Sequence, residues 1–210
     1  ALDKDPESVK IAENLSSLDK RFSFFNSSFG KLSDLVNRES ISGVLLDLGI
    51  SSNQLEDSSR GFSFQKTGPL DMRINQSEGI TASQWLSKAN KSEIEDVLWK
   101  LGNERASRKI AKLICNNREK EPINSTEDLS EIVKKCKSRR GKRHPATNVF
   151  RAIRMKINNE IVELKSALES TAKVLKEGGR LIVISFHSIE DRIVTRFLLG
   201  KDLDKQKELR

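Results

Sequence analysis

The 210-residue chain has few residues of the kinds that bind metals, and it lacks long apolar runs. No segment reaches the roughly 18 consecutive apolar residues of a membrane-spanning helix, and the N-terminus shows no signal-peptide pattern. Cys115 and Cys136 are isolated, with only His144 and His187 as other soft ligands. This set lacks the spacing of a zinc site, and two free thiols suit a reducing compartment. We therefore predict no metal and no membrane partner.

A glycine-rich loop that could cradle phosphates is also missing. Gly178-Gly179 precedes an apolar run instead of following one, so it predicts the end of a helix. The chain opens at ALDKDP without an initiator Met, and Ala1-Leu2-Asp3 has the pattern of the end of a strand. We expect the chain to be a fragment of a domain whose sheet contains further strands.

Charge is what the chain has in excess. Lys and Arg number 38 against 30 Asp and Glu, which gives a formal net charge of +8. Such a balance favours polyanionic partners. The run from Lys134 to His144 holds seven of these cations in eleven positions. It predicts neutralisation of phosphates, with a solvated loop as the alternative; the residues we assign to substrate binding are Lys137, Arg139, Arg140, Lys142 and Arg143.

Hydrophobic periodicity predicts an α/β fold. Asp5 as N-cap and Pro6 as first residue predict a helix to about Leu18. Strands are expected at 1–3, 21–25, 43–48 and 181–186, and helices around 31–38 and 150–175. Alternation of this kind is typical of a parallel sheet with crossover helices. The apolar run Leu181–Phe186 is expected to be buried on both faces, with Ser188 capping the helix that follows.

The segment between these two halves has a different hydrophobic pattern. From about 75 to 145 the apolar residues recur at helical spacing, and Thr126 opens one of the helices. No strand pattern is found there. We predict an inserted helical subdomain at 75–145, with the α/β domain formed by 1–74 and 146–210.

The segment Leu45–Arg73, LLDLGISSNQLEDSSRGFSFQKTGPLDMR, carries most of the polar candidates. An apolar strand runs into Asp47, and the long loop that follows carries aromatic residues and spaced charges, a composition unlike that of disordered segments. Loops of this length in compact domains are usually functional. We predict a pocket at the carboxyl end of the strand, where open α/β sheets hold ligands.

Each candidate also has a structural interpretation. Asp3 could bind a ribose or cap a helix, and Asp47 is a desolvated carboxylate that is expected to bind something. His187 could line a pocket or make a structural hydrogen bond. The polar loop residues Gln54, Asp71 and Arg73 could instead stabilise the loop.

Taken together, the motifs are similar to those of a known family. The order ALDKDP, LLDLGISSNQL, RGFSF, GPLDMR, KRHPAT and GGRLIVISFHSIEDRIV resembles the bacterial-type cytosine-N4 methyltransferases of small-subunit ribosomal RNA (the RsmH or MraW family). The resemblance covers about residues 1–199. It implies a Rossmann-like class I methyltransferase sheet, here incomplete, with an inserted all-helical domain that recognises the substrate.

The resemblance also implies roles for individual residues. Asp3, Phe29, Asp47 and Gln54 would contact the cofactor S-adenosyl-L-methionine. Asp47 would lie closest to the reacting centre. The cytidine pocket would be shaped by Asp71, Arg73 and His187, with Asp71 and His187 as further catalytic candidates.

The implied activity is methylation of the exocyclic N4 amino group of a cytidine in 16S ribosomal RNA. The partner would be the small ribosomal subunit, and the location the cytoplasm, with the mitochondrial matrix as the alternative. A ribosome-assembly factor that keeps the fold without activity is one competing hypothesis, and a methyltransferase acting on a small molecule or a protein is another. The oligomeric state stays open, a dimer being one option.

Overall fold

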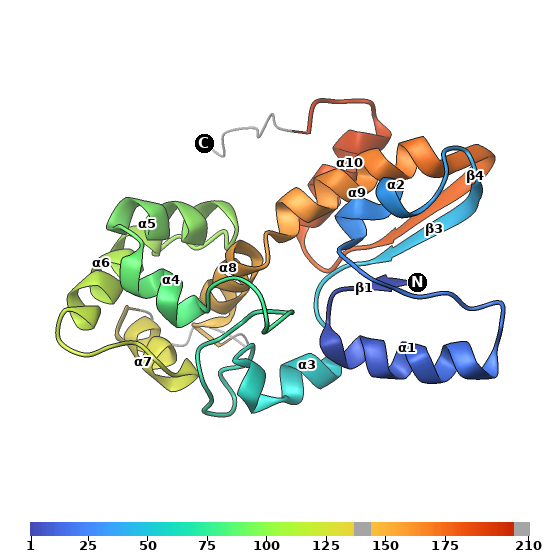
Figure 1. Cartoon of the computed structure of the whole chain (residues 1–210). Helices are drawn as coiled ribbons and strands as arrows, with labels where there is room; N and C mark the ends of the chain where they lie inside the picture. The colour runs from blue at the N-terminus through green and yellow to red at the C-terminus, as the bar shows by residue number, and fades with distance from the viewer. Residues whose placement is uncertain (137–143, 204–210) are drawn as a thin grey trace. The chain divides into compact units, whose positions relative to one another are not determined.

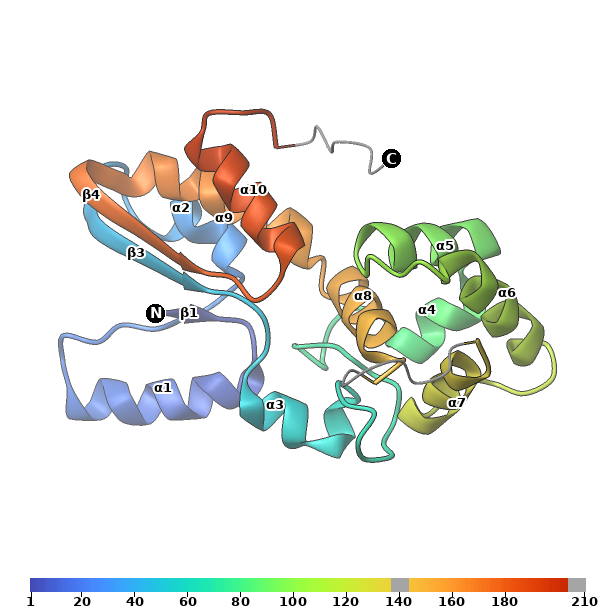
Figure 2. The ribbon, with the colours of Figure 1, turned by 180° about the vertical axis from the view of Figure 1, so that it is seen from behind.

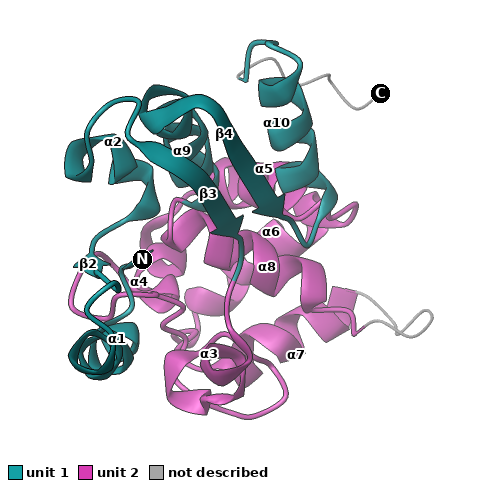
Figure 3. Ribbon diagram, turned by 90° about the vertical axis from the view of Figure 1, so that its right-hand side faces the viewer, with its two compact units in different colours: residues 1–49, 160–210 teal, residues 50–159 magenta. Residues whose placement is uncertain are grey.

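The chain forms two compact units. The computed structural model describes residues 1–136 and 144–203. Residues 1–49 and 160–210 form unit 1, and residues 50–159 form unit 2 (Figure 3). The helical stretch expected at 75–145 lies inside unit 2. That unit extends further at both ends because Leu70 and Met72 before the stretch, and Val149, Phe150 and Ile153 after it, pack in the same apolar core as its helices.

Unit 1 contains every strand of the described residues (Figure 1). Its elements, in chain order, are β1 (Leu2–Asp3), α1 (Pro6–Leu18), β2 (Phe25–Asn26), the 3₁₀ helix η1 (Phe29–Lys31), α2 (Leu32–Leu35), β3 (Ile41–Asp47), α9 (Glu160–Val174), β4 (Leu175–Ile184) and α10 (Ser188–Leu198).

The start of the chain folds as its residues predict. The Asp5 carboxylate accepts a hydrogen bond from the Glu7 amide, and Pro6 occupies the first turn of α1, where its missing N–H costs nothing. The bounds of α1 confirm the prediction. The next two elements are displaced: the strand expected at 21–25 is only β2, and the helix expected at 31–38 is the single turn α2 preceded by η1.

Both strand pairs are parallel, as the α/β alternation predicts. β1 pairs with β2, and β3 pairs with β4 in a register that places Leu45 opposite Ile182 and Asp47 opposite Ile184. The two pairs are separate two-stranded sheets in the described residues. The coarse prediction, an α/β fold with parallel pairing, is confirmed.

The apolar strand at 181–186 is not buried on both faces, so this prediction was wrong. Figures 1 and 2 show α2 and α9 on one side of the β3–β4 pair. On the opposite face Leu45, Ile182, Ile184 and Phe186 are 43–71% exposed. Composition alone therefore overstated the burial, because helices of unit 1 cover only one side of this two-stranded sheet.

The single helix expected over 150–175 is two helices. α8 (Thr147–Ile157) ends at Asn158, and Asn159 adopts a left-handed conformation with φ of 52° before α9 begins. The glycine pair does not mark the end of the helix, as had been predicted. β4 starts directly after α9, and Gly178, with a φ of 73°, lies within β4. There the pairing with β3 shifts in register.

Unit 2 is helical. Its elements are α3 (Ser52–Glu56), the 3₁₀ helix η2 (Ser58–Arg60), α4 (Ala82–Lys88), α5 (Lys91–Lys100), α6 (Ser107–Arg118), α7 (Thr126–Cys136) and α8. One cluster of buried apolar side chains joins α4 to α8 with the loop around Leu70. None of the described helices has the length and apolar character needed to cross a bilayer.

Candidate functional site

The loop between η2 and α4 is folded tightly onto unit 2 by two glycines. Gly61 has a φ of 72°, and a Cβ built on it would lie 2.2 Å from the Pro69 carbonyl oxygen. A Cβ on Gly68 would lie 1.9 Å from the carbonyl oxygen of Ser58. The loop is then tied to the start of α7, since the amide of Thr126 donates to the Gly68 carbonyl at 2.9 Å. Only glycine permits these backbone approaches.

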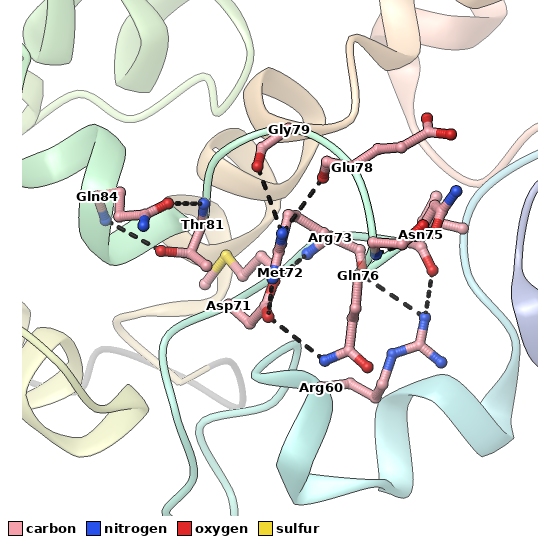
Figure 4. Close-up of polar contacts among 12 residues, drawn as sticks. Arg60, Asp71, Met72, Arg73, Asn75, Gln76, Glu78, Gly79, Thr81 and Gln84 are labelled. Atoms are coloured by element: carbon pink, nitrogen blue, oxygen red, sulfur yellow. Dashed lines mark hydrogen bonds and ion pairs between the residues drawn. The ribbon is translucent and has the colours of Figure 1, made fainter.

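The site residues Asp71 and Arg73 form a bidentate ion pair in this loop (Figure 4). Arg73 Nε donates to Asp71 Oδ1 at 2.7 Å, and Nη2 donates to Oδ2 at 2.8 Å. The Arg73 amide and the Gln76 carboxamide also donate to the same carboxylate, at 3.1 and 3.4 Å. Four donors therefore reach a carboxylate that is largely buried, an arrangement that fixes both side chains.

The pair shifts the titration of both groups. Burial opposes ionisation of Asp71, but the hydrogen bonds from the side chain and backbone of Arg73 outweigh it and hold the pKa of that carboxyl below its ordinary value. The same bonds raise the pKa of the Arg73 guanidinium. Both groups are thus charged at neutral pH, and the pair is a fixed dipole in the loop.

Backbone groups around this pair are held by two further side chains. The Arg60 guanidinium donates to the Ile74 carbonyl at 2.6 Å. Asn158, at the end of α8, accepts from the Ile74 amide at 2.8 Å and donates to the Met72 carbonyl at 2.7 Å. Between these bonds, buried Met72 has a φ of 64°, which is rare for a side chain of its size. Such strained residues cluster at functional sites.

In unit 1, Asp47 stands at the carboxyl end of β3. Its side chain is exposed, so the desolvation expected from the apolar strand was wrong. Leu46 is buried, and Asp47, the next residue of the strand, lies on the opposite, uncovered face of the sheet. Its carboxylate has no hydrogen bond or ion pair with the described residues. It is therefore available as an acceptor.

Asp3, the other carboxylate candidate in unit 1, has structural partners. Its two oxygens accept hydrogen bonds from the Asp5 amide and the Ser8 hydroxyl, each at 2.8 Å, so it helps fix the start of α1. This agrees with the structural alternative. A carboxylate has about four lone-pair sites, so these two bonds do not exhaust its capacity as an acceptor.

The remaining candidates from unit 1 and α3 are placed in different ways. Phe29 is half-buried in η1. Gln54 is buried in α3, where its side-chain oxygen accepts from the Ser51 amide and completes a capping box. The S-x-x-Q spacing of Ser51 and Gln54 is the signal that could have predicted α3 from sequence.

His187 is the N-cap of α10, a place we had predicted for Ser188. Its Nδ1 accepts from the Glu190 amide at 3.4 Å, and its Nε2 lies 3.1 Å from the Glu190 carboxylate. Glu190 in turn accepts from the Phe186 amide. The imidazole supplies an acceptor three residues before Glu190, so no serine is needed. The structural alternative for His187 is thus the one observed.

The basic run at 134–144, which is expected to bind substrate, lies mostly outside the described residues; the part outside includes Lys137, Arg139, Arg140, Lys142 and Arg143. At its end His144 stacks on Phe64, with ring centroids 4.3 Å apart, and Phe64 meets Phe150 edge-on. No cluster of three potential metal-binding side chains is found among the described residues.

Comparison with known proteins places these motifs in a family. The model of the MraW methylase family matches residues 1–208. The chain belongs to this family. "Ribosomal RNA small subunit methyltransferase H" of Coxiella burnetii (strain Dugway 5J108-111) is 46% identical over 209 residues, covering 97% of this chain and 68% of the relative. The proteins of the same name from Shewanella amazonensis and Stenotrophomonas maltophilia (strain K279a) are 48% and 47% identical, with 64% and 62% of their lengths covered.

Two residues that hold this candidate site together were missed from sequence. Arg60 is the first residue of the RGFSF motif but was given no role of its own, and Asn158 fell inside an expected helix with no spacing that singles it out. Their role follows only from the tertiary contacts with the loop at 72–74.

We expect Asn158→Ala to loosen the Asp71–Arg73 loop of this methylase. The variant removes the partner of the part-buried Ile74 amide and of the buried Met72 carbonyl, at a cost of about 2 kcal/mol. Hydrogen exchange at the Ile74 amide measures the effect and should be faster by at least tenfold. Asn117→Ala is a matched control, because Asn117, like Asn158, donates to a carbonyl four residues back, at 2.8 and 2.9 Å, but makes no hydrogen bond to residues 71–74. Equal exchange in both variants would contradict the assigned role.

The ion pair should make stability depend on acid pH. Because the folded-state pKa of Asp71 lies below its unfolded value of about 3.9, the pair contributes stability that is fully present above that value. The contribution is lost as the pH falls through the folded pKa. The difference in unfolding free energy between wild type and Asp71→Asn is therefore expected to be largest near neutral pH and to shrink below about pH 4. Urea titrations at several pH values test this; a constant difference would refute it.

Proposed function

We propose that the protein transfers the methyl group of S-adenosyl-L-methionine to the N4 amino group of a cytidine in small-subunit (16S) ribosomal RNA. The observation that carries the proposal is the family match over residues 1–208, together with relatives that bear the name of small-subunit ribosomal RNA methyltransferases. The geometry of Asp47 and of the Asp71–Arg73 loop supports it.

The finer fold belongs to the same proposal. We propose that unit 1 is a Rossmann-like class I methyltransferase sheet and that unit 2 is the inserted domain that recognises the substrate. Parallel pairing in both strand pairs and the insertion of unit 2 between β3 and α9 support this assignment.

The candidate cofactor residues, of which Gln54 belongs to unit 2 and the others to unit 1, have side chains that suit a cofactor of this type. When bound, S-adenosyl-L-methionine supplies a methyl group on a positively charged sulfur. Asp3 keeps acceptor capacity for ribose hydroxyls. Phe29 offers a half-buried ring for the adenine, and Gln54 holds the start of α3 in a fixed conformation for a further contact. Asp47 is exposed at the end of β3.

Asp47 is the residue that we assign to the chemistry. The amino group of cytosine is a hydrogen-bond donor, and its lone pair is delocalised into the ring. An aspartate that accepts this hydrogen bond helps to localise the lone pair, and it or water can take the proton that leaves. The Asp71 carboxylate is less suited, since four donors already occupy it. We assign Asp71 the role of orienting Arg73.

Unit 2 would hold the RNA. The target base must leave its stack to be methylated, and cations such as those of the 137–143 run bind the backbone without reading its sequence. In this proposal Arg73 contacts the cytidine, and the basic run supplies affinity.

The proposal is tested by incubating the protein with labelled S-adenosyl-L-methionine and small ribosomal subunits and mapping the product. Label on the N4 atom of a single cytidine of the 16S RNA is the expected result. RNA binding without label would favour the assembly factor, and label on a small molecule or a protein would favour another methyltransferase class.

A further inference from the structure

The exposed side of α6 and of the turn that enters it carries cations and no acid. Arg105 lies in the turn, and Arg108, Lys109 and Lys112 follow in the helix; all four are exposed. None of them makes an ion pair with the described residues. The one acid in 104–118 is Glu104, which is buried and accepts from the Ala106 amide. We call these four cations the α6 patch.

The placement of these charges opposes helix formation. Arg108 and Lys112 stand four residues apart, where like charges repel. Arg108 and Lys109 lie in the first turn, where the helix dipole disfavours cations. By contrast, α5 and α7 carry acids in their first turns, and their exposed faces contain ion pairs of Lys100 and Lys134 with carboxylates. Charges placed this unfavourably for the helix, without a structural interaction that compensates for them, are expected at functional sites.

The opposite side of α6 fixes the patch in place. Ile110, Ala111 and Ile114 are fully buried in the core of unit 2, so the helix cannot turn its cations inward. At a rise of 1.5 Å per residue, the patch extends over roughly 10 Å, enough for about two or three successive phosphates. No large exposed apolar side chain lies between residues 105 and 118, so the patch lacks the apolar component of a membrane-binding helix.

We infer that the α6 patch binds backbone phosphates of the substrate RNA. This inference rests on the proposed function for the identity of the RNA. It adds the cations at residues 105–112 to those that the sequence provides at 137–143. The phosphates would offset the repulsion among the cations, and the contact would be insensitive to base sequence.

The first test compares two variants of equal charge. Replacing the four patch cations by Gln lowers the formal net charge from +8 to +4, and so does the control that replaces four exposed lysines of unit 1, Lys10, Lys20, Lys173 and Lys176. Binding of 16S RNA is measured over a range of salt concentrations. We expect the patch variant to bind at least tenfold more weakly at low salt, with a slope of log affinity against log salt shallower by about 2. The control should stay within twofold of wild type.

Equal losses in the two variants would overturn the inference, because net charge alone would explain them. A poly-glutamate competitor that displaces the RNA as well as polyphosphate does would also overturn it, in favour of an acidic protein partner. Labelled methyl transfer is followed in parallel. Unchanged salt slopes with intact methylation would refute the patch alone, whereas a shallower slope without any methylation would refute the proposed activity alone.

A second variant separates binding from folding. Arg108→Glu places an acid in the first turn of α6, so the unfolding temperature is expected to rise while RNA affinity falls at least fivefold. If Arg108 had only a structural role, the unfolding temperature and the RNA affinity would change in the same direction. A higher unfolding temperature with unchanged RNA affinity would overturn the inference.

Discussion

Asp47→Asn is expected to lower the rate of methyl transfer by about 100-fold or more, the lower end of what general acid–base groups contribute. The amide has the shape of the carboxylate but lacks its charge, so it is a weaker acceptor for the cytidine amino group and cannot take its proton. The fold should be unaffected, because the Asp47 side chain is exposed and makes no bond to the described residues. Single-turnover kinetics with saturating cofactor measure the rate.

Asp34→Asn is the matched control for this prediction. Asp34 is also an exposed aspartate of unit 1, on α2 rather than at a strand end, and makes no bond to the described residues. Its replacement should leave the rate unchanged. If Asp47→Asn methylates within about threefold of wild type, Asp47 has no part in the proton chemistry. Cofactor affinity measured beside the rate shows whether a loss arises in binding instead.

Gly61→Ala is expected to destabilise unit 2 by about 3 kcal/mol or more, because the new methyl group would overlap the Pro69 carbonyl. The clash involves backbone on both sides, so no side chain can move away to relieve it. Both tryptophans of the chain, Trp85 and Trp99, lie in unit 2, and their fluorescence during urea unfolding reports on this unit.

Gly79→Ala is the control that distinguishes the steric clash at Gly61 from the strain of a left-handed backbone. The two glycines have φ values of 72° and 70°, so alanine meets the same left-handed strain at both, about 1–2 kcal/mol. No atom lies within 4 Å of a Cβ at Gly79. The difference between the variants therefore measures the close approach of the loop to itself. Equal destabilisation would show that Gly61 is needed only for its conformation.

Local sequence signals predicted the parts of the fold that local chemistry decides. Asp5 and Pro6 start α1 where expected, because a capping group and a restricted φ act within a few residues, and α7 begins at Thr126 as predicted. The parallel pairing also followed from alternation. What failed depended on distant neighbours: nothing near Leu181–Phe186 in sequence reveals that only one face of β4 is covered.

For the candidate site, too, local sequence signals were predictive and contacts between distant residues were not predicted. Motif resemblance pointed to Asp71 and Arg73, and the structure joins them, but their separation by one residue did not reveal a bidentate pair. Asn158 reaches the loop from 84 residues away and carries no local signal. Asp47 was expected to be desolvated because a run of apolar residues precedes it, yet the pleat turns it to the open face.

The insertion of unit 2 between β3 and α9 has a consequence for the order of folding. Unit 2 is one continuous segment, whereas the β3–β4 pair joins Gly43 to Arg180, across the whole of that segment. Closing so long a loop in an unfolded chain costs entropy, and contacts between distant residues form slowly. Once unit 2 has folded, its two ends are fixed and the loop that β3 and β4 must close is far shorter. We therefore expect unit 2 to form first and to template the sheet.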